Sequence, residues 1–452
     1  MTHRPLIWSV DLDAPLAWRN GQPLSRRQYL ADVRALAKAL PASGPMLNVA
    51  TDRYRFAVGL GAAMLRGQTN LLPPNHTSDM VARLREAFAG TYCLADEQAP
   101  SVDLPTIRHP TTQAPIESRG VPSIDADAQT AQVLTSGSTG APVPHVKRWG
   151  LLARNAAAEA ERLAEHLGRA DLAGVSLVAT VPSQHMYGFE STVLMGLLGG
   201  AAFETGRPFY AADIARALAC VPRPRMLVTT PFHLKMLLES GVDVPALDLT
   251  VCATAALAPQ LAARAESVLG APLMEIYGCT EAGQVATRRT TAGPEWRTYR
   301  DLHLSGDGER TIVDGGHVPQ PTPLADVLEV IDAQTFRLLG RSNDLINVAG
   351  KRSSISHLNY HLNTIEGVHD GAFWLPIGDA DVVRLVAFVV APQVSREQIL
   401  GALRQRVDAA FLPRRIVSVP SLPRDATGKL PAGRLAALAE QWLAPVAPRA
   451  NG

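Results

Sequence analysis

Residues 132–142 read QVLTSGSTGAP, a short apolar run followed at once by alternating hydroxyl and glycine residues. An apolar run bounded by a glycine-rich segment is typical of a buried strand that ends in a turn. Glycines let that turn expose its backbone N–H groups, and the hydroxyls add donors, so the segment predicts a loop that holds a polyphosphate. The spacing is not that of the GxxxxGK[ST] phosphate loop, and on composition alone an ordinary serine–glycine turn explains it equally well.

The same pattern of an apolar run followed by a polar or glycine-bearing loop repeats further along the chain. The runs are Ser176–Val181, Met226–Thr229, Thr250–Ala253 and Met274–Tyr277, separated by helical stretches such as Leu151–Leu167 and Pro259–Leu269. This alternation predicts the α/β class, with parallel strands and helices on the sheet faces. Because the carboxyl ends of parallel strands meet at one edge, we expect five loops to converge there: Thr135–Gly140, His185–Gly188, Thr229–His233, Thr254–Leu257 and Gly278–Gly283.

The two ends of the chain differ in pattern. The first 130 residues predict helices near 25–40, 54–66 and 78–90, each ended by a proline or a glycine. Residues 344–452 predict a small α+β unit, with helices near 354–365 and 395–410 and strands near 371–375, 385–390 and 415–419. We therefore expect a large N-terminal domain over 1–341 and a small C-terminal domain over 342–452, with the boundary near Ser342–Asp344.

Composition excludes several classes of function. The 452 residues are 46% hydrophobic and 19% charged with a net charge of +1, which predicts a globular protein and argues against a nucleic-acid or membrane-surface binder. The most apolar stretch, 193–203, is too short to span a membrane, and the N-terminus lacks the apolar core of a signal peptide. The four cysteines lie far apart, so we expect reduced thiols in a cytoplasmic protein. We expect a monomer or a homodimer.

Lysine is scarce in this chain. The 43 basic residues include only five lysines, at Lys38, Lys147, Lys235, Lys351 and Lys429. Because arginine takes almost every other basic position, a position that keeps lysine is a candidate for needing a compact ammonium group.

Four further segments carry a recognisable pattern: EIYGCTE at 275–281, GRSND at 340–344, NVAGKR at 347–352 and PRDATGKL at 423–430. Together with the segment at 135–142, and in this order, they resemble the motifs of the adenylate-forming (AMP-binding) superfamily of acyl- and aryl-CoA synthetases and adenylation domains. Within this superfamily, one branch is resembled most: the short ligases of bacterial aryl polyene and xanthomonadin-type pigment clusters. Segments such as TVPSQHMYGFES at 180–191 and GRPFY at 206–210 carry this resemblance.

The resemblance implies that ATP and Mg²⁺ are bound by residues of these motifs. The phosphates would lie against Thr135, Ser136, Gly137, Ser138, Thr139 and Gly140. Tyr277 and Gly278 would face the adenine, Thr280 the α-phosphate and Glu281 the Mg²⁺. Asp326 and Arg341, fifteen residues apart, would bind the ribose, although the Thr-Gly that normally precedes this Asp is missing. The alternatives are a solvated loop acid at Glu281 and a surface acid at Asp326.

The resemblance also implies that Lys429 is the catalytic cation and that the C-terminal domain rotates about a hinge at Asn343. Lys429 would offset the repulsion between the attacking carboxylate and the α-phosphate. After rotation, the loop that ends at Arg352 would reach the nucleotide site instead. Val143 stands where the family has a lysine, so either Lys147 reaches the pyrophosphate or this charge is absent. Asn343 replaces the usual hinge aspartate.

A pocket for the acid is expected at the other loops. Its candidate walls are His185, Tyr187, Gly188, Phe189, Thr230, Phe232, His233, Thr254 and Ala255, of which Thr254 would also touch the nucleotide. His185 would gate the pocket and join Thr280, Glu281 and Lys429 in the catalytic set, or it is a histidine satisfied by backbone partners. Phe189 and Phe232 would flank a flat ring, or they pack in the core.

The expected reaction activates a small carboxylic acid, such as a hydroxybenzoate, as acyl-AMP and transfers it to a phosphopantetheine thiol of an acyl carrier protein or of coenzyme A. An anionic carrier would suit an arginine patch at Arg404, Arg406, Arg414 and Arg415, although a solvated helix face explains these residues as well. The alternatives are an aliphatic acyl-CoA synthetase and a non-catalytic binder of nucleotide or carrier protein.

Overall fold

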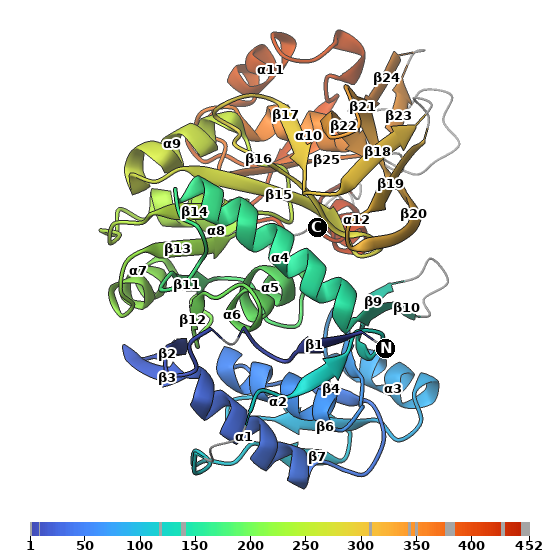
Figure 1. The fold of residues 1–452 in the computed structure, drawn as a ribbon. Helices are drawn as coiled ribbons and strands as arrows, with labels where there is room; N and C mark the ends of the chain where they lie inside the picture. Colours follow the sequence, from blue (N-terminus) through green and yellow to red (C-terminus); the bar gives the residue numbers. More distant parts are fainter. Residues whose placement is uncertain are drawn as a thin grey trace.

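The computed structural model describes residues 2–8, 10–116, 120–136, 142–306, 310–341, 345–348, 351–375, 385–425 and 430–443. Its centre is an eleven-stranded sheet with a parallel interior, as the alternating pattern predicted (Figure 1). The parallel strands, in spatial order, are β15 (Leu273–Cys279), β14 (Leu249–Cys252), β13 (Arg225–Thr229), β11 (Ser176–Ala179), β12 (Ala202–Glu204) and β2 (Pro15–Arg19).

Antiparallel strands extend this sheet at both ends. β3 (Gln22–Ser25) pairs with β2 at one edge. At the other edge the order continues through β16 (Gly283–Arg288), β17 (Glu295–Thr298), β22 (Thr335–Arg341) and β21 (Asp326–Val330). A separate antiparallel sheet, β18 (Leu302–Gly306), β19 (Thr311–Gly315) and β20 (Val318–Leu324), is inserted in the chain just before β21.

The predicted strand of the opening segment belongs to a different sheet. It is β9 (Gln129–Ser136), in a six-stranded sheet of order β10 (Pro142–Arg148), β9, β5 (Asn70–Leu72), β4 (Met46–Asn48), β6 (Tyr92–Ala95) and β7 (Thr106–Arg108). The expectation that five loops leave one sheet edge is therefore wrong for Thr135–Gly140. The physical reason is that β9 is followed by a hairpin to antiparallel β10 and not by a crossover helix.

Helices cover both sheets, and those near 25–40, 54–66, 78–90, 151–167 and 259–269 lie where the sequence predicted helices. The segment 229–233, predicted as a loop, instead leads into a helix that begins at Pro231. They are α1 (Arg26–Ala39), α2 (Arg53–Leu65), α3 (Ser78–Ala87), α4 (Trp149–His166), α7 (Ala211–Ala219), α8 (Pro231–Glu239) and α9 (Pro259–Leu269). The short α5 (Met186–Gly188) and α6 (Met195–Leu197) flank a π-helix at Phe189–Leu194. Ser25 caps α1, because its Oγ accepts the backbone N–H of Gln28 at 3.1 Å. None of the described helices is long and apolar enough to cross a membrane.

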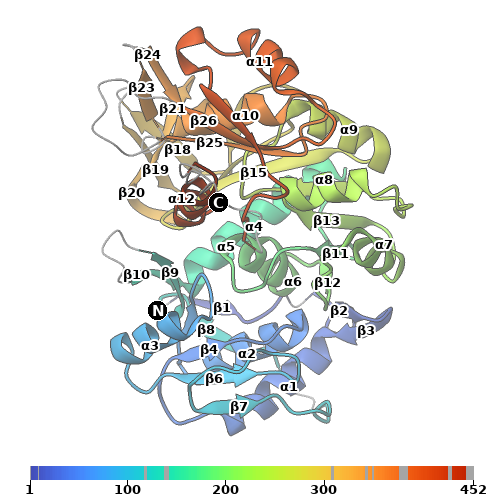
Figure 2. The ribbon, with the colours of Figure 1, turned by 180° about the vertical axis from the view of Figure 1, so that it is seen from behind.

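Residues 345–443 form the C-terminal unit, which Figure 2 shows from behind. It contains β23 (Leu345–Val348), β24 (Lys351–Ser354), α10 (Ile355–Asn363), β25 (Asp370–Trp374), β26 (Val386–Val390), α11 (Arg396–Arg404), β27 (Arg415–Ser418) and α12 (Ala432–Leu443). Helix α11 ends earlier than expected, and a short 3₁₀ helix at Ala409–Phe411 follows, capped by Asp408.

The C-terminal unit has its own hydrophobic cores. Two clusters, one running from Ile346 to Ile416 and one from Ala372 to Ala439, contain no residue from the preceding chain. This supports two domains, while the proposed boundary residues 342–344 lie outside the described part of the chain, and the division stays a prediction.

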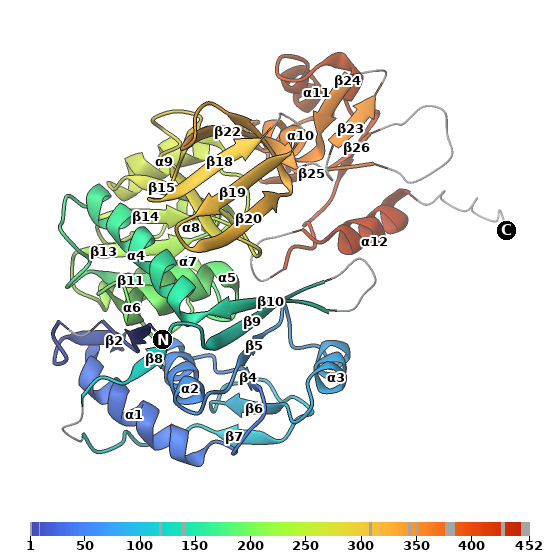
Figure 3. The ribbon, with the colours of Figure 1, turned by 45° about the vertical axis from the view of Figure 1, so that its right-hand side comes forward.

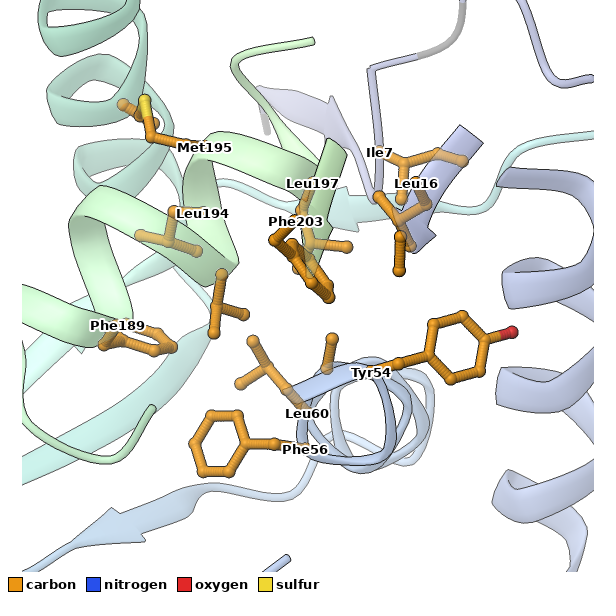
Figure 4. Close-up of a cluster of buried hydrophobic side chains, with 14 of the residues drawn as sticks. Ile7, Leu16, Tyr54, Phe56, Leu60, Phe189, Leu194, Met195, Leu197 and Phe203 are labelled. Atoms are coloured by element: carbon orange, nitrogen blue, oxygen red, sulfur yellow. The ribbon is translucent and has the colours of Figure 1, made fainter. Parts of the chain in front are cut away.

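The main core joins the two large sheets. Figure 4 shows Phe203 of β12 among Leu16, Leu197 and Leu60, which come from three other segments. Phe203 is 0% exposed, and a Cβ added at Gly196 would lie only 2.4 Å from its ring. The ring therefore fills a site that its neighbours enclose tightly.

We expect Phe203→Ala to lower the free energy of unfolding by about 3–5 kcal/mol, because the surrounding side chains cannot close the cavity left behind. Urea denaturation followed by circular dichroism measures this change. Val268→Ala, at a side chain 61% exposed on α9, is the matched control and should change stability by less than about 1 kcal/mol. Equal effects of the two substitutions would contradict the assignment of this core.

Candidate active site

Tyr277, Asp326 and Arg341, which are all predicted to bind the nucleotide, come together although β15, the strand of Tyr277, is not adjacent to β21 and β22 in the central sheet. Tyr277, near the end of β15, is 7% exposed, and its hydroxyl donates to Asp326 Oδ2 at 2.7 Å. Asp326 begins β21, and its Cα lies directly opposite that of Arg341 in the β21–β22 ladder. The fifteen-residue spacing is thus the length of a hairpin. The Tyr277 ring packs edge-on against Trp296 and Phe336, with centroids 5.8 and 5.5 Å apart.

The turn between β15 and β16 presents the predicted metal ligand. Glu281 is exposed on this turn, and Thr280 precedes it half-buried. A Cβ at Gly278 would lie 2.5 Å from the carbonyl oxygen of Gly283, so the turn can close only with glycine at that position. A carboxylate on a tight, exposed turn can join phosphate oxygens around Mg²⁺. Among the described residues, no three or more His, Cys, Asp or Glu side chains come close enough to hold a metal ion by themselves.

The β9–β10 hairpin reaches this turn although it belongs to the other sheet. Lys147 on β10 is 9% exposed, and its Nζ donates to the backbone carbonyl of Thr280. Thr135 Oγ1 lies 3.0 Å from His145 Nε2, a side chain that sequence reasoning missed. Burial lowers the pKa of His145, and the charge of Glu281 opposes this shift. The hairpin that carries the predicted phosphate loop and the turn that carries Glu281 are therefore joined by Lys147.

Part of the predicted site falls outside the described residues. This holds for Gly137, Ser138, Thr139, Gly140, Asn343 and Lys429. The side chains of Ser136, Arg341 and Arg352 are also outside the description, although their backbones lie in β9, β22 and β24. The roles of these residues stay predictions.

The residues predicted to line the acid pocket lie in the segments that follow β11, β13 and β14. Thr254, two residues after β14, has φ of +83°, a conformation that β-branched residues adopt only when the surroundings enforce it. Tyr187 donates its hydroxyl to the carbonyl of Val251 at 3.0 Å, which ties the loop at 185–188 to β14. His185 is half-buried at the start of α5, and Ala255 is exposed.

The two phenylalanines of the pocket lie in different surroundings. Phe189 is 0% exposed within the main hydrophobic core, as its alternative assignment predicted. Phe232 is 36% exposed on the first turn of α8, with its ring centroid 6.4 Å from that of Phe209. His233, the residue after Phe232, is fully buried, and its Nδ1 lies 2.8 Å from the hydroxyl oxygen of Thr230. Gly188 lies so close to Pro182 that a Cβ would meet its carbonyl at 2.0 Å.

A buried polar cluster behind the turn was not found from the sequence. Glu190, in the π-helix, is 3% exposed and accepts a hydrogen bond from Asn155 Nδ2 at 2.6 Å. Burial raises the pKa of Glu190 to about 8, and the ammonium of Lys147 opposes this shift. Gly283 ends the turn with φ of +78°, and a Cβ there would lie 3.1 Å from Glu190 Oε1. The carboxyl group of Glu190 therefore rests against the turn from behind.

Glu159 belongs to the same cluster. It is 0% exposed one turn after Asn155 on α4, and burial raises its pKa to about 7. Gln284 and Ser191, which are hydrogen-bonded to each other at 2.8 Å, lie beside it. The sequence did hold a signal, because Asn155 and Glu159 interrupt the apolar face of α4 that Leu152, Ala156 and Leu163 define.

We expect Lys147→Met to raise the KM for Mg·ATP about ten-fold, because the carbonyl of Thr280 and the carboxyl of Glu190 both lose their cation. ATP–pyrophosphate exchange measured against Mg·ATP concentration gives this value. Lys38→Met makes the same chemical change at an exposed position of α1 and should leave the KM unchanged. An unchanged KM in Lys147→Met would show that Lys147 does not contribute to the binding of Mg·ATP.

We also expect Glu159 to make stability depend on pH. Its pKa rises from 4.5 in the unfolded chain to about 7 in the fold, so its contribution is fully present below pH 4.5 and is lost as pH rises through 7. Between pH 5 and pH 8 the wild-type chain should therefore lose about 2.5 kcal/mol relative to Glu159→Gln, which does not ionise. Urea denaturation of both proteins at the two pH values measures the difference. A constant difference would show that the pKa of Glu159 is the same in the folded and the unfolded chain, so that burial does not raise it.

The fold and the placement of the predicted site residues are those expected of an α/β nucleotide-binding enzyme. Residues 54–339 match the family described as AMP-binding enzyme, and the chain belongs to this family. Among similar proteins, the 4-coumarate–CoA ligase of Halorhodospira halophila is 32% identical over 311 residues, which cover 66% of this chain and 73% of that protein. The 2,3-dihydroxybenzoate–AMP ligase of Bacillus subtilis is 22% identical over 56% of this chain and 54% of its own length.

Solved structures share the fold over almost the whole chain. An anthranilate CoA ligase in complex with anthranoyl-AMP superposes with a TM-score of 0.77 at 16% identity, covering 98% of this chain and 99% of its own. The o-succinylbenzoate coenzyme A synthetase of Bacillus subtilis in complex with ATP and magnesium also gives a TM-score of 0.77 at 16% identity, with coverage of 95% and 98%. The predicted superfamily and the α/β fold class are therefore confirmed, and the predicted enzyme class, an ATP-dependent, AMP-forming acid–thiol ligase, is confirmed at the level of the family.

Proposed function

We propose that this protein activates a small aryl carboxylic acid as acyl-AMP and transfers the acyl group to the thiol of a phosphopantetheine. One observation carries the proposal. The Tyr277–Asp326 pair, the Glu281 turn and the Thr254 bend all lie near the carboxyl ends of the neighbouring strands β14 and β15. Several relatives are named for aryl acids, among them 4-coumarate, anthranilate and 2,3-dihydroxybenzoate. That shared chemistry favours an aryl acid over an aliphatic one.

In the proposed nucleotide site, each residue meets one part of ATP. Asp326 and Arg341 hold the ribose hydroxyls, and Tyr277 lies against the adenine. Thr280 faces the α-phosphate. Glu281 would hold Mg²⁺, which neutralises phosphate charge when bound. Lys147 and Glu190 touch no substrate in this scheme but fix the turn that carries Thr280 and Glu281.

In the first half-reaction a carboxylate oxygen of the acid attacks the α-phosphorus, and the bond to pyrophosphate breaks. Both reacting groups are anions, so a cation between them lowers the barrier. Lys429 supplies this charge from the C-terminal unit. The segment from Thr135 to Gly140 receives the departing pyrophosphate through backbone N–H groups and hydroxyls.

In the second half-reaction the thiol sulfur attacks the acyl carbon, its proton is lost and AMP leaves. The C-terminal unit turns about Asn343 between the two steps, which withdraws Lys429 and brings the loop ending at Arg352 to the site. Closure in both orientations keeps water from the acyl-AMP. Arg404, Arg406, Arg414 and Arg415 are all exposed on this unit, so they are available to an acidic carrier protein, and coenzyme A is the other acceptor.

We expect Lys429→Ala to slow ATP–pyrophosphate exchange by more than ~10², or about 3 kcal/mol, the effect of losing one transition-state donor. Thioester formation from supplied acyl-AMP should proceed nearly as in the wild type, because Lys429 has then left the site. Lys38→Met is the control. Survival of the exchange activity in Lys429→Ala would show that another group is the catalytic cation.

Exchange activity across benzoates, cinnamates and fatty acids tests the substrate class. We expect the highest kcat/KM with a benzoate or a cinnamate, and repeating the assay with coenzyme A and with a phosphopantetheinylated carrier protein identifies the acceptor. Preference for a fatty acid would contradict the aryl assignment. Nucleotide binding with no exchange on any acid would instead make the chain a non-catalytic binder.

A further inference from the structure

One lysine joins the C-terminal unit to the rest of the chain. Lys235 lies on α8, and its Nζ donates to the backbone carbonyl of Val368 at 2.7 Å and to that of His369. Both carbonyls belong to the connection between α10 and β25. One turn further along α8, Glu239 Oε2 lies 3.7 Å from His369 Nδ1. We call these interactions the Lys235 contact.

The Lys235 contact is partly shielded from water. Burial lowers the pKa of Lys235, while the charges of Glu239 and Asp370 oppose this shift. An ammonium group with three donors can bond two adjacent carbonyls at once and still fit a narrow space between a helix and a loop. This requirement explains why a chain so poor in lysine keeps one at this position.

The contact lies next to the segment that leads to Lys429. Asp370 follows directly after His369 and accepts two hydrogen bonds from Arg424, at 2.7 and 2.6 Å. Arg424 is the arginine of the PRDATGKL segment, five residues before Lys429. Helix α8, which also carries Phe232 and His233 of the proposed acid pocket, is therefore connected through residues 368–370 to the base of that segment.

The Lys235 contact is made with the C-terminal unit in the orientation that the structure shows. In three views α12, which starts just after the PRDATGKL segment, lies between the β25–β27 sheet and the β9–β10 hairpin (Figure 3). The β23–β24 hairpin, which carries Arg352, lies at the far end of the unit in the same views. The side of the unit that carries α12 thus lies toward the β9–β10 hairpin.

We infer that Lys235 is a positioning residue for adenylation. It holds the C-terminal unit in the orientation that serves the first half-reaction, and its two hydrogen bonds break when the unit turns for thioester formation. This inference rests on the proposed function, in which the two half-reactions use different orientations. In this inference the contact forms only in the adenylation orientation, so losing it shifts the population away from adenylation.

Lys235→Met keeps the length of the side chain and removes the ammonium group. We expect it to lower the rate of ATP–pyrophosphate exchange about ten-fold, the effect of losing charged hydrogen bonds in one of two states. Thioester formation from supplied acyl-AMP should stay equal to wild type or become faster. Lys235→Arg retains donors and should restore part of the exchange rate. A substitution that merely damaged the fold would slow both half-reactions together.

A distance measurement tests the same inference without relying on activity. Cys220 is exposed on the large part of the chain and Glu397 is exposed on α11, while Cys93 and Cys252 are buried. Cys279 is half-buried, so every labelled protein carries Cys279→Ser to leave a single pair of labels. Spin labels on Cys220 and on Glu397→Cys should give one dominant distance in the otherwise wild-type chain. In Lys235→Met we expect a second population. Lys38→Met should behave as wild type in both measurements.

The inference is overturned if Lys235→Met matches Lys38→Met in its exchange rate and in its distance distribution. That result leaves the proposed function intact when the wild-type chain catalyses exchange. If the wild-type chain exchanges no acid, the proposed function fails, and the distance distribution still decides whether Lys235 holds the C-terminal unit.

Discussion

The hydrogen bond from the buried ammonium of Lys147 to the carbonyl of Thr280 holds the candidate site together. Two sheets that do not share a strand pair approach each other there, and this bond fixes the hairpin of one against a turn of the other. Withdrawing an ammonium group from water is costly unless it finds acceptors and opposite charge. Thr280 supplies the acceptor, and the nearby carboxyl groups of Glu190 and Glu281 oppose the lowering of the Lys147 pKa by burial. The position of the turn is thus set by an interaction whose loss leaves several polar groups unpaired.

The two buried carboxyl groups behind the turn lower the stability of the fold when they are ionised. Both Glu159 and Glu190 have raised pKa values because burial penalises their ionised forms. A core built for stability alone would carry apolar side chains at these positions. Their presence next to Lys147 is consistent with a rigid, polar support for a turn that must hold its shape beside a highly charged ligand.

Local features of the fold were predictable from the sequence because short-range physics decides them. The start of α1 near Ser25 and the bounds of α9 each follow from a few neighbouring residues. The pairing of Asp326 with Arg341 was expected only from the resemblance, and the structure shows that they face each other in a hairpin. The assignment of β9 to the central sheet was wrong, because a strand's own residues do not specify its partners. The same limit applies to the acid pocket: the sequence could not separate Phe189, which is in the core, from Phe232, which is at the surface. The contribution of Lys235 was also hidden, since its partners are backbone carbonyls more than a hundred residues away.

The backbone at Thr254 has a consequence for how this protein can change. A left-handed conformation at a β-branched residue costs about 1–3 kcal/mol, and glycine would adopt it without that penalty. Replacing Thr254 by glycine would therefore stabilise the fold. It would also remove a methyl and a hydroxyl group from beside the predicted nucleotide and acid sites. A homologue with glycine at this position would be expected to unfold at a higher temperature, other things being equal.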